Sequence, residues 1–97
     1  MYHVYILYSP GGDRYYVGQT QDLEQRMTYH NELNEHSYTS KFRPWELKSS
    51  FPVASRSVAL KMEKFVKNKK QRSFLERLIA TPELWEDILK KIDDSVG

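Results

Sequence analysis

The sequence has no cysteine among its 97 residues. This absence excludes disulfide bridges, zinc sites built from thiolates and cysteine nucleophiles, and it is typical of a cytosolic protein. Long hydrophobic runs are also missing, since no apolar stretch approaches the roughly 20 residues that span a bilayer. The N-terminal segment MYHVYILYS contains neither the basic region nor the small-residue cleavage site of a signal peptide. We therefore expect a cytoplasmic protein that has no membrane partner.

Glycine and proline are scarce, with four of each, and the sequence contains no internal repeat, low-complexity tract or linker. A chain of this length has room for one domain with a modest core. Its composition, 39% hydrophobic and 29% charged, is that of a globular protein rather than a disordered one. We expect residues 1–97 to form a single domain, with its core in residues 2–80 and a C-terminal helix at residues 82–94.

Positive charge is concentrated in one segment of the chain. Residues 41–72 carry ten Lys or Arg and two Glu, a net charge of +8, whereas the whole chain carries only +2. The rest of the sequence is therefore net acidic, at −6. A basic segment in an otherwise acidic chain is a plausible binding surface for a polyanion. The same charges also fit an ordinary solvated helix face, and charge alone does not separate the two interpretations.

A β-hairpin is predicted at the start of the sequence. Residues 2–9 (YHVYILYS) are aromatic and β-branched, and residues 14–20 (RYYVGQT) continue in the same manner. Between them, Pro-Gly-Gly-Asp is typical of a turn. The short connection predicts that the two strands are antiparallel.

The middle of the chain predicts a helix, a loop and a third strand. Asp22 lies at the start of a helix that runs to about Leu33, where its charge favours the positive end of the helix dipole. Residues 34–44 are polar and aperiodic, which indicates a loop. A short strand follows from Trp45 to Phe51 and is expected to end at Pro52.

Three further helices are predicted in the C-terminal half. Ser55 or Ser57 can cap a helix that runs to about Asn68 and has one apolar face. The segment 73–76 (SFLE) has capping-box spacing before a short helix. The pair at 81–82 (TP) is typical of the start of the last helix, which reaches about residue 94. The order β-β-α-β-α-α-α predicts an α+β fold, in which helices pack on a small antiparallel sheet.

Two tyrosines of the hairpin are candidate functional residues. Strand alternation places Tyr5 with Leu7 on one face, and Tyr16 with Gly18 on one face of the second strand. If Tyr5 and Tyr16 pair across the hairpin, their hydroxyls can reach the same point. Strand tyrosines are, however, usually core or rim residues, and Gly18 is equally typical of a bulge or a close backbone approach. In the functional interpretation, the missing side chain of Gly18 leaves room for a ligand beside Tyr16.

Arg26 and His30 lie four residues apart on the helix that follows the hairpin, beside its core-facing pair Leu23 and Met27. A helix in this place directs both side chains over the sheet edge, near Tyr16. An arginine there can bind a phosphate with its planar guanidinium, and a histidine can orient a water or transfer a proton. The alternative is an ordinary exposed helix face.

Glu63 is an acidic residue beside the apolar face of the helix at residues 55–68. A carboxylate is rarely buried without a partner. Glu63 is therefore expected either to pair with an arginine such as Arg26 or to bind a hard cation. Mg²⁺ typically takes one or two protein carboxylates and keeps water in its other positions.

These residue types together favour hydrolysis of a phosphodiester. The reaction needs an activated water, a cation near the developing charge and stabilisation of the leaving oxygen. The pKa of a tyrosine is normally near 10. A tyrosine can therefore act as the base only where nearby positive charge stabilises its phenolate.

The hairpin resembles the paired motif of the GIY-YIG nuclease superfamily. Val4-Tyr5-Ile6 and Tyr16-Val17-Gly18 match its two tripeptides in order and spacing. Further positions resemble its small single-domain bacterial members: Thr20, Asp22-Leu23, Arg26, His30, Thr39-Ser40-Lys41 and residues 59–63 (ALKME). The resemblance spans about residues 2–80. It implies a three-stranded antiparallel sheet flanked by helices, in agreement with the element order.

The resemblance implies a metal-dependent endonuclease that acts on DNA, in repair or processing, and it implies catalytic roles for five residues. Tyr5 and Tyr16 are the motif tyrosines, and Tyr16 is the better candidate to help deprotonate the attacking water. Arg26 corresponds to the arginine that contacts the phosphate, and His30 to a residue that supports the water or the base. Glu63 corresponds to the carboxylate that holds a divalent metal, Mg²⁺ or Mn²⁺.

The sequence also departs from the family pattern. His3 occupies the position of the glycine in the first motif. Gln19 occupies the position where some members have a lysine, so one positive charge is missing unless Lys41 supplies it. Asn68 is the candidate for a polar asparagine of some branches. The expected nucleic-acid contacts come from the basic segment: Lys41, Arg43, Lys61, Lys64, Lys67 and Lys70.

Two other functions are compatible with the sequence. A nucleic-acid-binding module of the same fold, with little or no turnover, would use residues 41–72 as its working surface. A protein-interaction domain would present Phe42, Trp45 and Trp85 to a partner, although the same aromatic residues are equally suited to a core.

Overall fold

A computed structural model describes residues 1–33 and 38–96 of the chain and confirms the predicted α+β class. Its elements are β1 (Tyr2–Ser9), β2 (Arg14–Thr20), α1 (Leu23–Thr28), the π-helix η1 (Tyr29–Leu33), the 3₁₀-helix η2 (Tyr38–Phe42), β3 (Glu46–Val53), α2 (Arg56–Asn68), α3 (Arg72–Ala80) and α4 (Leu84–Val96). The order of strands and α-helices is the predicted one. The predicted loop at 34–44 instead contains η2, and its positions 34–37 lie outside the described residues.

The sheet has the strand order β2-β1-β3, and both pairs are antiparallel. Because four residues form the turn of the hairpin, Ser9 is opposite Arg14. This register places Tyr5 opposite Gly18, and Tyr16 opposite Leu7. Tyr5 and Tyr16 are therefore not direct partners across the hairpin. They share a face as diagonal neighbours, with ring centroids 6.5 Å apart.

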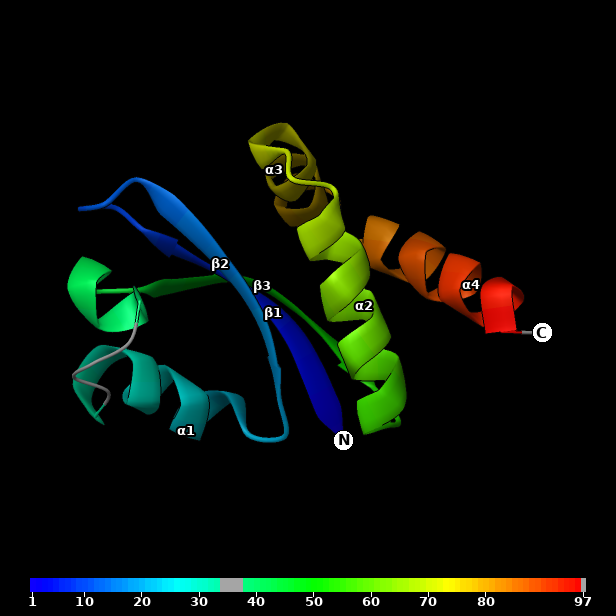
Figure 1. Ribbon diagram of the computed structural model, residues 1–97, viewed down its shortest axis with the longest axis horizontal. Helices are drawn as coiled ribbons and strands as arrows, with labels where there is room; N and C mark the ends of the chain where they lie inside the picture. The colour runs from blue at the N-terminus through cyan, green and yellow to red at the C-terminus, as the bar shows by residue number, and fades with distance from the viewer. Residues whose placement is uncertain (34–37, 97) are drawn as a thin grey trace.

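The two faces of the sheet carry separate clusters, as strand alternation predicts. Val4 and Ile6 of β1 are fully buried in a core that α2, α3 and α4 cover. Tyr5 and Leu7, on the other face, pack in a smaller cluster with Trp45. Figure 1 shows α1 and the η segments on one side of the sheet, and α2, α3 and α4 on the other. Of the candidate site residues, Tyr5 and Tyr16 belong to the smaller cluster.

Local capping chemistry determines where two of the helices begin. The Asp22 carboxylate accepts a hydrogen bond from the backbone N–H of Gln25 at 3.0 Å, and α1 starts at the next residue. The Ser55 hydroxyl accepts one from the N–H of Val58 at 3.2 Å, at the start of α2. The predicted helix from Asp22 to Leu33 is found, but its second half is the π-helix η1. Single π-turns of this kind are frequent at functional sites.

The end of the third strand differs from the prediction. Pro52 lies inside β3, opposite His3, instead of ending the strand. Proline is tolerated there because β3 is an edge strand of the sheet.

Two helix starts in the C-terminal half also differ. The capping box at residues 73–76 is absent: α3 starts at Arg72, its N-cap Gln71 makes no side-chain bond, and Glu76 contacts Arg72 and Tyr15 instead. The last helix starts at Leu84 and not at Pro82, because residues 81–84 form a turn. None of the helices in the described part of the chain is long and apolar enough to cross a membrane.

Candidate active site

A buried chain of three polar side chains lies at the centre of the smaller cluster. The Tyr5 hydroxyl is 3.0 Å from Nε2 of His30, and Nδ1 of His30 is 3.0 Å from the Thr39 hydroxyl. The exposed fractions of the three residues are only 1%, 1% and 3%. They come from β1, η1 and η2. His30 is therefore not on an exposed helix face, which was the alternative for this position.

Gly18 makes room for this chain through a close approach, which was one of its two interpretations. A Cβ atom at position 18 would lie 2.5 Å from Oη and 2.7 Å from Cζ of Tyr5. The space beside the glycine is therefore filled by the Tyr5 ring and not by a ligand next to Tyr16. Gly18 is required because the Tyr5 ring approaches its backbone closely, and not because of a positive φ.

Tyr16 stands beside the buried chain and is partly exposed. Its ring contacts His30 edge-on, with centroids 5.0 Å apart, and lies 6.1 Å from the ring of Trp45. On the side of α2, the ammonium of Lys67 lies 5.8 Å from the Tyr16 ring centroid. Of the two motif tyrosines, Tyr16 is the one that a solvent-borne ligand can reach.

Arg26 joins the same group from α1. Its guanidinium stacks over the ring of Tyr29, with Cζ 4.5 Å from the centroid, and lies close enough to the Tyr5 phenol for each group to shift the pKa of the other. Burial by itself lowers the pKa of Arg26, but the neighbouring tyrosine oxygens outweigh it and raise the pKa above its ordinary value. Within the described residues, the buried Nε–H of Arg26 has no hydrogen-bond partner. Buried donors are seldom left unpaired, so an anionic ligand is a natural partner for this atom.

The protonation states of the buried chain follow from its surroundings. Burial raises the pKa of the Tyr5 phenol to about 12, although the contact with Arg26 opposes this shift. Burial and the positive charge of Arg26 lower the pKa of His30 to about 4. Tyr5 is therefore a phenol, and His30 a neutral imidazole, at neutral pH.

Glu63 lies on α2 and pairs with Lys67 instead of Arg26. Its Oε2 is 2.8 Å from Nζ of Lys67, one helical turn away, and the exposed fraction of its side chain is 20%. Its negative charge is close enough to raise the pKa of Tyr5, which places it near the tyrosine cluster. Among the described residues no three His, Asp or Glu side chains gather as a metal cluster. A divalent ion at Glu63 would therefore take its other ligands from water and a bound phosphate.

Residues 39–45 are held against the site by hydrogen bonds of their own. The Asn31 amide accepts from the Trp45 backbone N–H at 2.7 Å and donates to the Trp45 carbonyl at 3.1 Å. The Trp45 indole N–H donates to the Thr39 carbonyl at 2.7 Å. Arg43, predicted to contact nucleic acid, donates its Nε–H to the His30 carbonyl at 2.8 Å. Trp45 is 2% exposed, so it is a core residue and not a docking surface.

A groove of about 430 Å³ starts at Tyr16 and runs between β2 and the α2–α3 junction. Its basic lining residues are Arg14, Lys67, Lys70 and Arg72. Asp13 also lines it and is paired with Arg72. Of the predicted nucleic-acid contacts, the groove therefore contains Lys67 and Lys70, while the pattern in the sequence missed Arg14 and Arg72.

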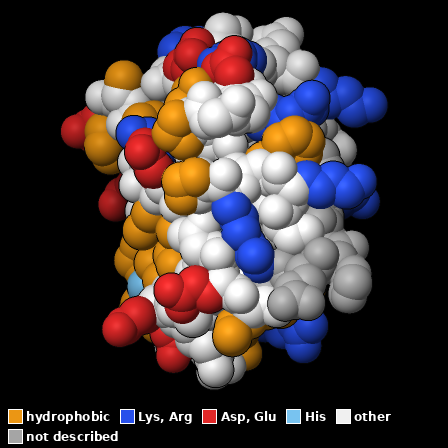
Figure 2. All heavy atoms as spheres, turned by 90° about the vertical axis from the view of Figure 1, so that its left-hand side faces the viewer, with side chains coloured by type: hydrophobic (Ala, Val, Ile, Leu, Met, Phe, Trp, Pro, Cys, Tyr) orange, Lys and Arg blue, Asp and Glu red, His pale blue; other side chains and the backbone are white. Residues whose placement is uncertain are grey.

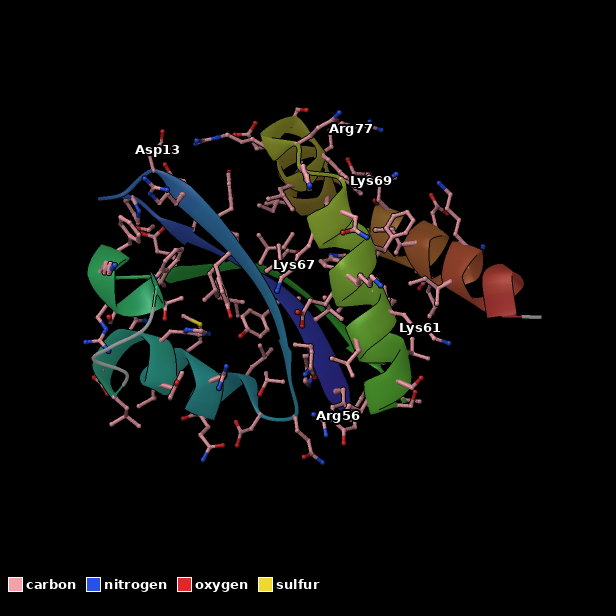
Figure 3. All side chains as sticks on the ribbon, in the orientation of Figure 1. Asp13, Arg56, Lys61, Lys67, Lys69 and Arg77 are labelled. Atoms are coloured by element: carbon pink, nitrogen blue, oxygen red, sulfur yellow. The ribbon has the colours of Figure 1, made fainter. Side chains whose placement is uncertain are left out.

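The remaining predicted contacts lie elsewhere. Lys41 is exposed on η2, and Lys61 and Lys64 are exposed on α2. Lys67 extends from α2 toward the sheet, whereas Lys61 extends from the opposite side of the helix (Figure 3). Figure 2 shows Lys and Arg side chains mainly along one margin of the molecule and acidic side chains mainly along the other.

A larger hollow of about 540 Å³ lies between α2, α3 and α4, with Phe65, Phe74 and Ile88 in its lining. It contains none of the five predicted catalytic residues. The smaller groove is the better candidate for a substrate channel because Tyr16 belongs to it.

Several residues of the site could not be read from the sequence. Thr39 lies in a predicted loop and Asn31 in a predicted helix, and nothing local distinguishes either from the other polar residues of its segment. The pairing of Tyr5 with Gly18 could have been found, because a four-residue turn fixes the register of a hairpin.

The sequence was compared with known proteins and families. Residues 1–77 match the family model described as the GIY-YIG catalytic domain. No curated protein and no solved structure gave a significant match. The match covers all three strands, α1 and α2, and it contains every predicted catalytic residue. On this evidence the chain belongs to the GIY-YIG catalytic domain family.

Proposed function

We propose that this protein is a divalent-metal-dependent endonuclease that hydrolyses DNA phosphodiester bonds. Family membership implies nuclease-type chemistry. The observation that carries the proposal for this chain is the buried Nε–H of Arg26, which lacks a partner among the described residues and lies next to two tyrosines and a histidine. A phosphate oxygen would satisfy this donor with charge-assisted geometry.

Tyr5 and Tyr16 have different roles in the proposed reaction. Tyr5 is buried, protonated and bonded to His30, so it orients its neighbours and does not take the proton of the water. Tyr16 is accessible and has the Lys67 ammonium over its ring. Tyr16 therefore takes the proton from the attacking water, while Arg26 stabilises the charge that develops on the phosphate.

Glu63 is the residue that would hold the metal. It offers a hard, anionic oxygen with a partly exposed side chain, which suits Mg²⁺ or Mn²⁺ with water and phosphate as further ligands. A bound ion would polarise the phosphate oxygen and stabilise the leaving group. Lys67 must then release the carboxylate, and it remains near Tyr16 as a second cation.

The groove beside Tyr16 supports nucleic acid as the substrate. Four basic side chains and one acidic side chain line it, so its net charge complements a phosphate backbone. We infer that DNA enters along β2 and that the protein serves in DNA repair or processing in the cytoplasm.

A nicking assay with supercoiled plasmid tests this proposal. Wild-type protein should relax the plasmid only with Mg²⁺ or Mn²⁺, and Arg26→Ala or Glu63→Ala should remove the activity. Arg77→Ala and Glu86→Ala are matched controls, because both residues are exposed and neither lines the groove beside Tyr16. Equal cleavage by wild type and Arg26→Ala would show that a contaminant cuts the plasmid, and the proposal would fail.

A second candidate function is a nucleic-acid-binding module with little turnover. The Lys67–Glu63 pair favours it, since the carboxylate already has a cationic partner. In this case, DNA binding would weaken steeply with salt and would be unaffected by Glu63→Ala. Metal-dependent nicking that is lost with Glu63→Ala would exclude this alternative.

A further inference from the structure

The far end of the buried chain is Thr39, a residue for which the family resemblance implies no role. Its hydroxyl lies 3.0 Å from Nδ1 of His30, and both residues are buried. A hydroxyl can donate or accept, so the distance alone does not tell which atom carries the proton.

The positive charge of Arg26 favours one direction of the chain. Its guanidinium has only donors and its charge acts on both the Tyr5 phenol and the His30 ring, so the Tyr5 O–H is directed away from it. Nε2 of His30, 3.0 Å from the Tyr5 oxygen, is then the acceptor. Because Nε2 is the acceptor, the single proton of the neutral imidazole is on Nδ1. This Nδ1–H donates to the hydroxyl oxygen of Thr39.

Thr39 is held firmly in this position. Its carbonyl accepts the indole N–H of Trp45 at 2.7 Å, and Trp45 is in turn fixed at both backbone groups by the Asn31 amide. Asn31 directly follows His30 in the chain. The two ends of the loop are therefore joined, so that Thr39 and the histidine ring keep a fixed relative placement.

The charged and titratable groups facing the histidine ring come from several elements. Among the described residues they are Tyr5 of β1, Tyr16 of β2, Arg26 of α1 and Tyr29, which precedes His30 in η1. Tyr5 contacts the Nε2 end of the ring, and Thr39 contacts the Nδ1 end.

We propose that Thr39 is a positioning residue that keeps His30 in the Nδ1–H tautomer. In this tautomer Nε2 accepts the Tyr5 O–H, and the lone pairs of the Tyr5 oxygen face Arg26. The catalytic consequence rests on the proposed nuclease function. The tautomer itself does not, and it can be measured without substrate.

Nitrogen-15 NMR of the histidine side chains tests the tautomer directly. The chain has three histidines, and the His30 signals are identified by their loss in His30→Gln. In the wild-type protein at neutral pH, we expect Nδ1 to show the shift of a protonated ring nitrogen and Nε2 that of an unprotonated one. Free histidine favours the opposite tautomer, so a protonated Nε2, or an average of the two forms, would overturn the proposal.

Variants of Thr39 link the tautomer to the reaction. Thr39→Val has nearly the same shape but no acceptor, so the proton should move to Nε2; Thr39→Ser should keep it on Nδ1. Thr28→Val, the same change two residues before His30, should leave the His30 signals as in the wild type, because the Thr28 hydroxyl bonds to the Glu24 carbonyl.

The cleavage rates should follow the tautomer. We expect Thr39→Val to lower kcat about 10- to 100-fold with little change in KM, as for other residues that orient a catalytic group. Thr39→Ser should restore kcat to within about threefold of the wild type, by the same reasoning. An active Thr39→Val with an unchanged tautomer would contradict the inference. If wild-type protein does not cleave DNA, the proposed function fails, while the NMR result still decides the tautomer.

Discussion

Tyr5 lies opposite Gly18 in the hairpin, and its phenol ring occupies the volume that any side chain at position 18 would need. The glycine of one motif is thus required by the tyrosine of the other. This contact explains why β2, whose other residues all have bulky or polar side chains, has a glycine at position 18.

Gly18→Ala should therefore displace the Tyr5 ring and break its bond with His30. Overpacking of this kind costs about 1–3 kcal/mol, so thermal unfolding should occur at a lower temperature. Gly11→Ala is the matched control, because a Cβ atom there has no neighbour within 4 Å, and its effect should be within about 0.5 kcal/mol. Equal stability of the two variants would show that the Tyr5 ring does not require the glycine.

Lys67→Met should alter the metal dependence more than the stability. An exposed ion pair contributes only about 0–1 kcal/mol to folding, but the Lys67 ammonium competes with a metal for Glu63. We expect half-maximal nicking at a lower Mn²⁺ concentration, with a lower maximal rate because the cation over Tyr16 is lost. Lys48→Met, which breaks another Lys–Glu pair on β3, should change neither quantity. An unchanged Mn²⁺ titration for Lys67→Met would contradict the proposed metal position.

His30 should make the stability of the fold depend on pH. The pKa of His30 is lowered from 6.5 to about 4 in the folded state. Between these two pH values the imidazole is protonated in the unfolded chain and neutral in the folded chain. The stabilising contribution is complete above pH 6.5 and is lost as the pH falls toward 4. It amounts to about 3 kcal/mol by linkage.

Urea unfolding at several pH values between 7 and 4 measures this effect. The free energy of unfolding should fall more steeply for the wild type than for His30→Gln, whereas His3→Gln should retain the wild-type slope. Parallel curves for the wild type and His30→Gln would show that the buried imidazole does not resist protonation.

Lys70→Gln tests whether the groove beside Tyr16 holds the nucleic acid. Loss of one phosphate contact should raise KM with kcat unchanged, and should reduce the slope of log K against log salt by about 1. Lys61→Gln, on the opposite side of α2, should have a smaller effect on both quantities. Equal effects of the two variants would indicate that the whole basic segment binds, and not the groove.

The sequence by itself determined the secondary structure where local chemistry is sufficient. Alternation fixed the two faces of β1, and Asp22 and Ser55 fixed the starts of α1 and α2 through hydrogen bonds to nearby N–H groups. The order and spacing of the motif tyrosines, Arg26, His30 and Glu63 also make them candidate site residues, and their catalytic roles stay predictions. The local sequence pattern predicted a capping box at residues 73–76 that does not form. Glu76 instead contacts Arg72 in its own helix and Tyr15 on β2.

Only the tertiary structure decided which partner each functional group has. It paired Glu63 with Lys67, placed Tyr5 against Gly18 and joined His30 to Thr39. Hydrogen bonds and ion pairs depend on separations of a few tenths of an ångström, and such separations are set by how whole elements pack. A pattern of residue types along the chain does not contain them.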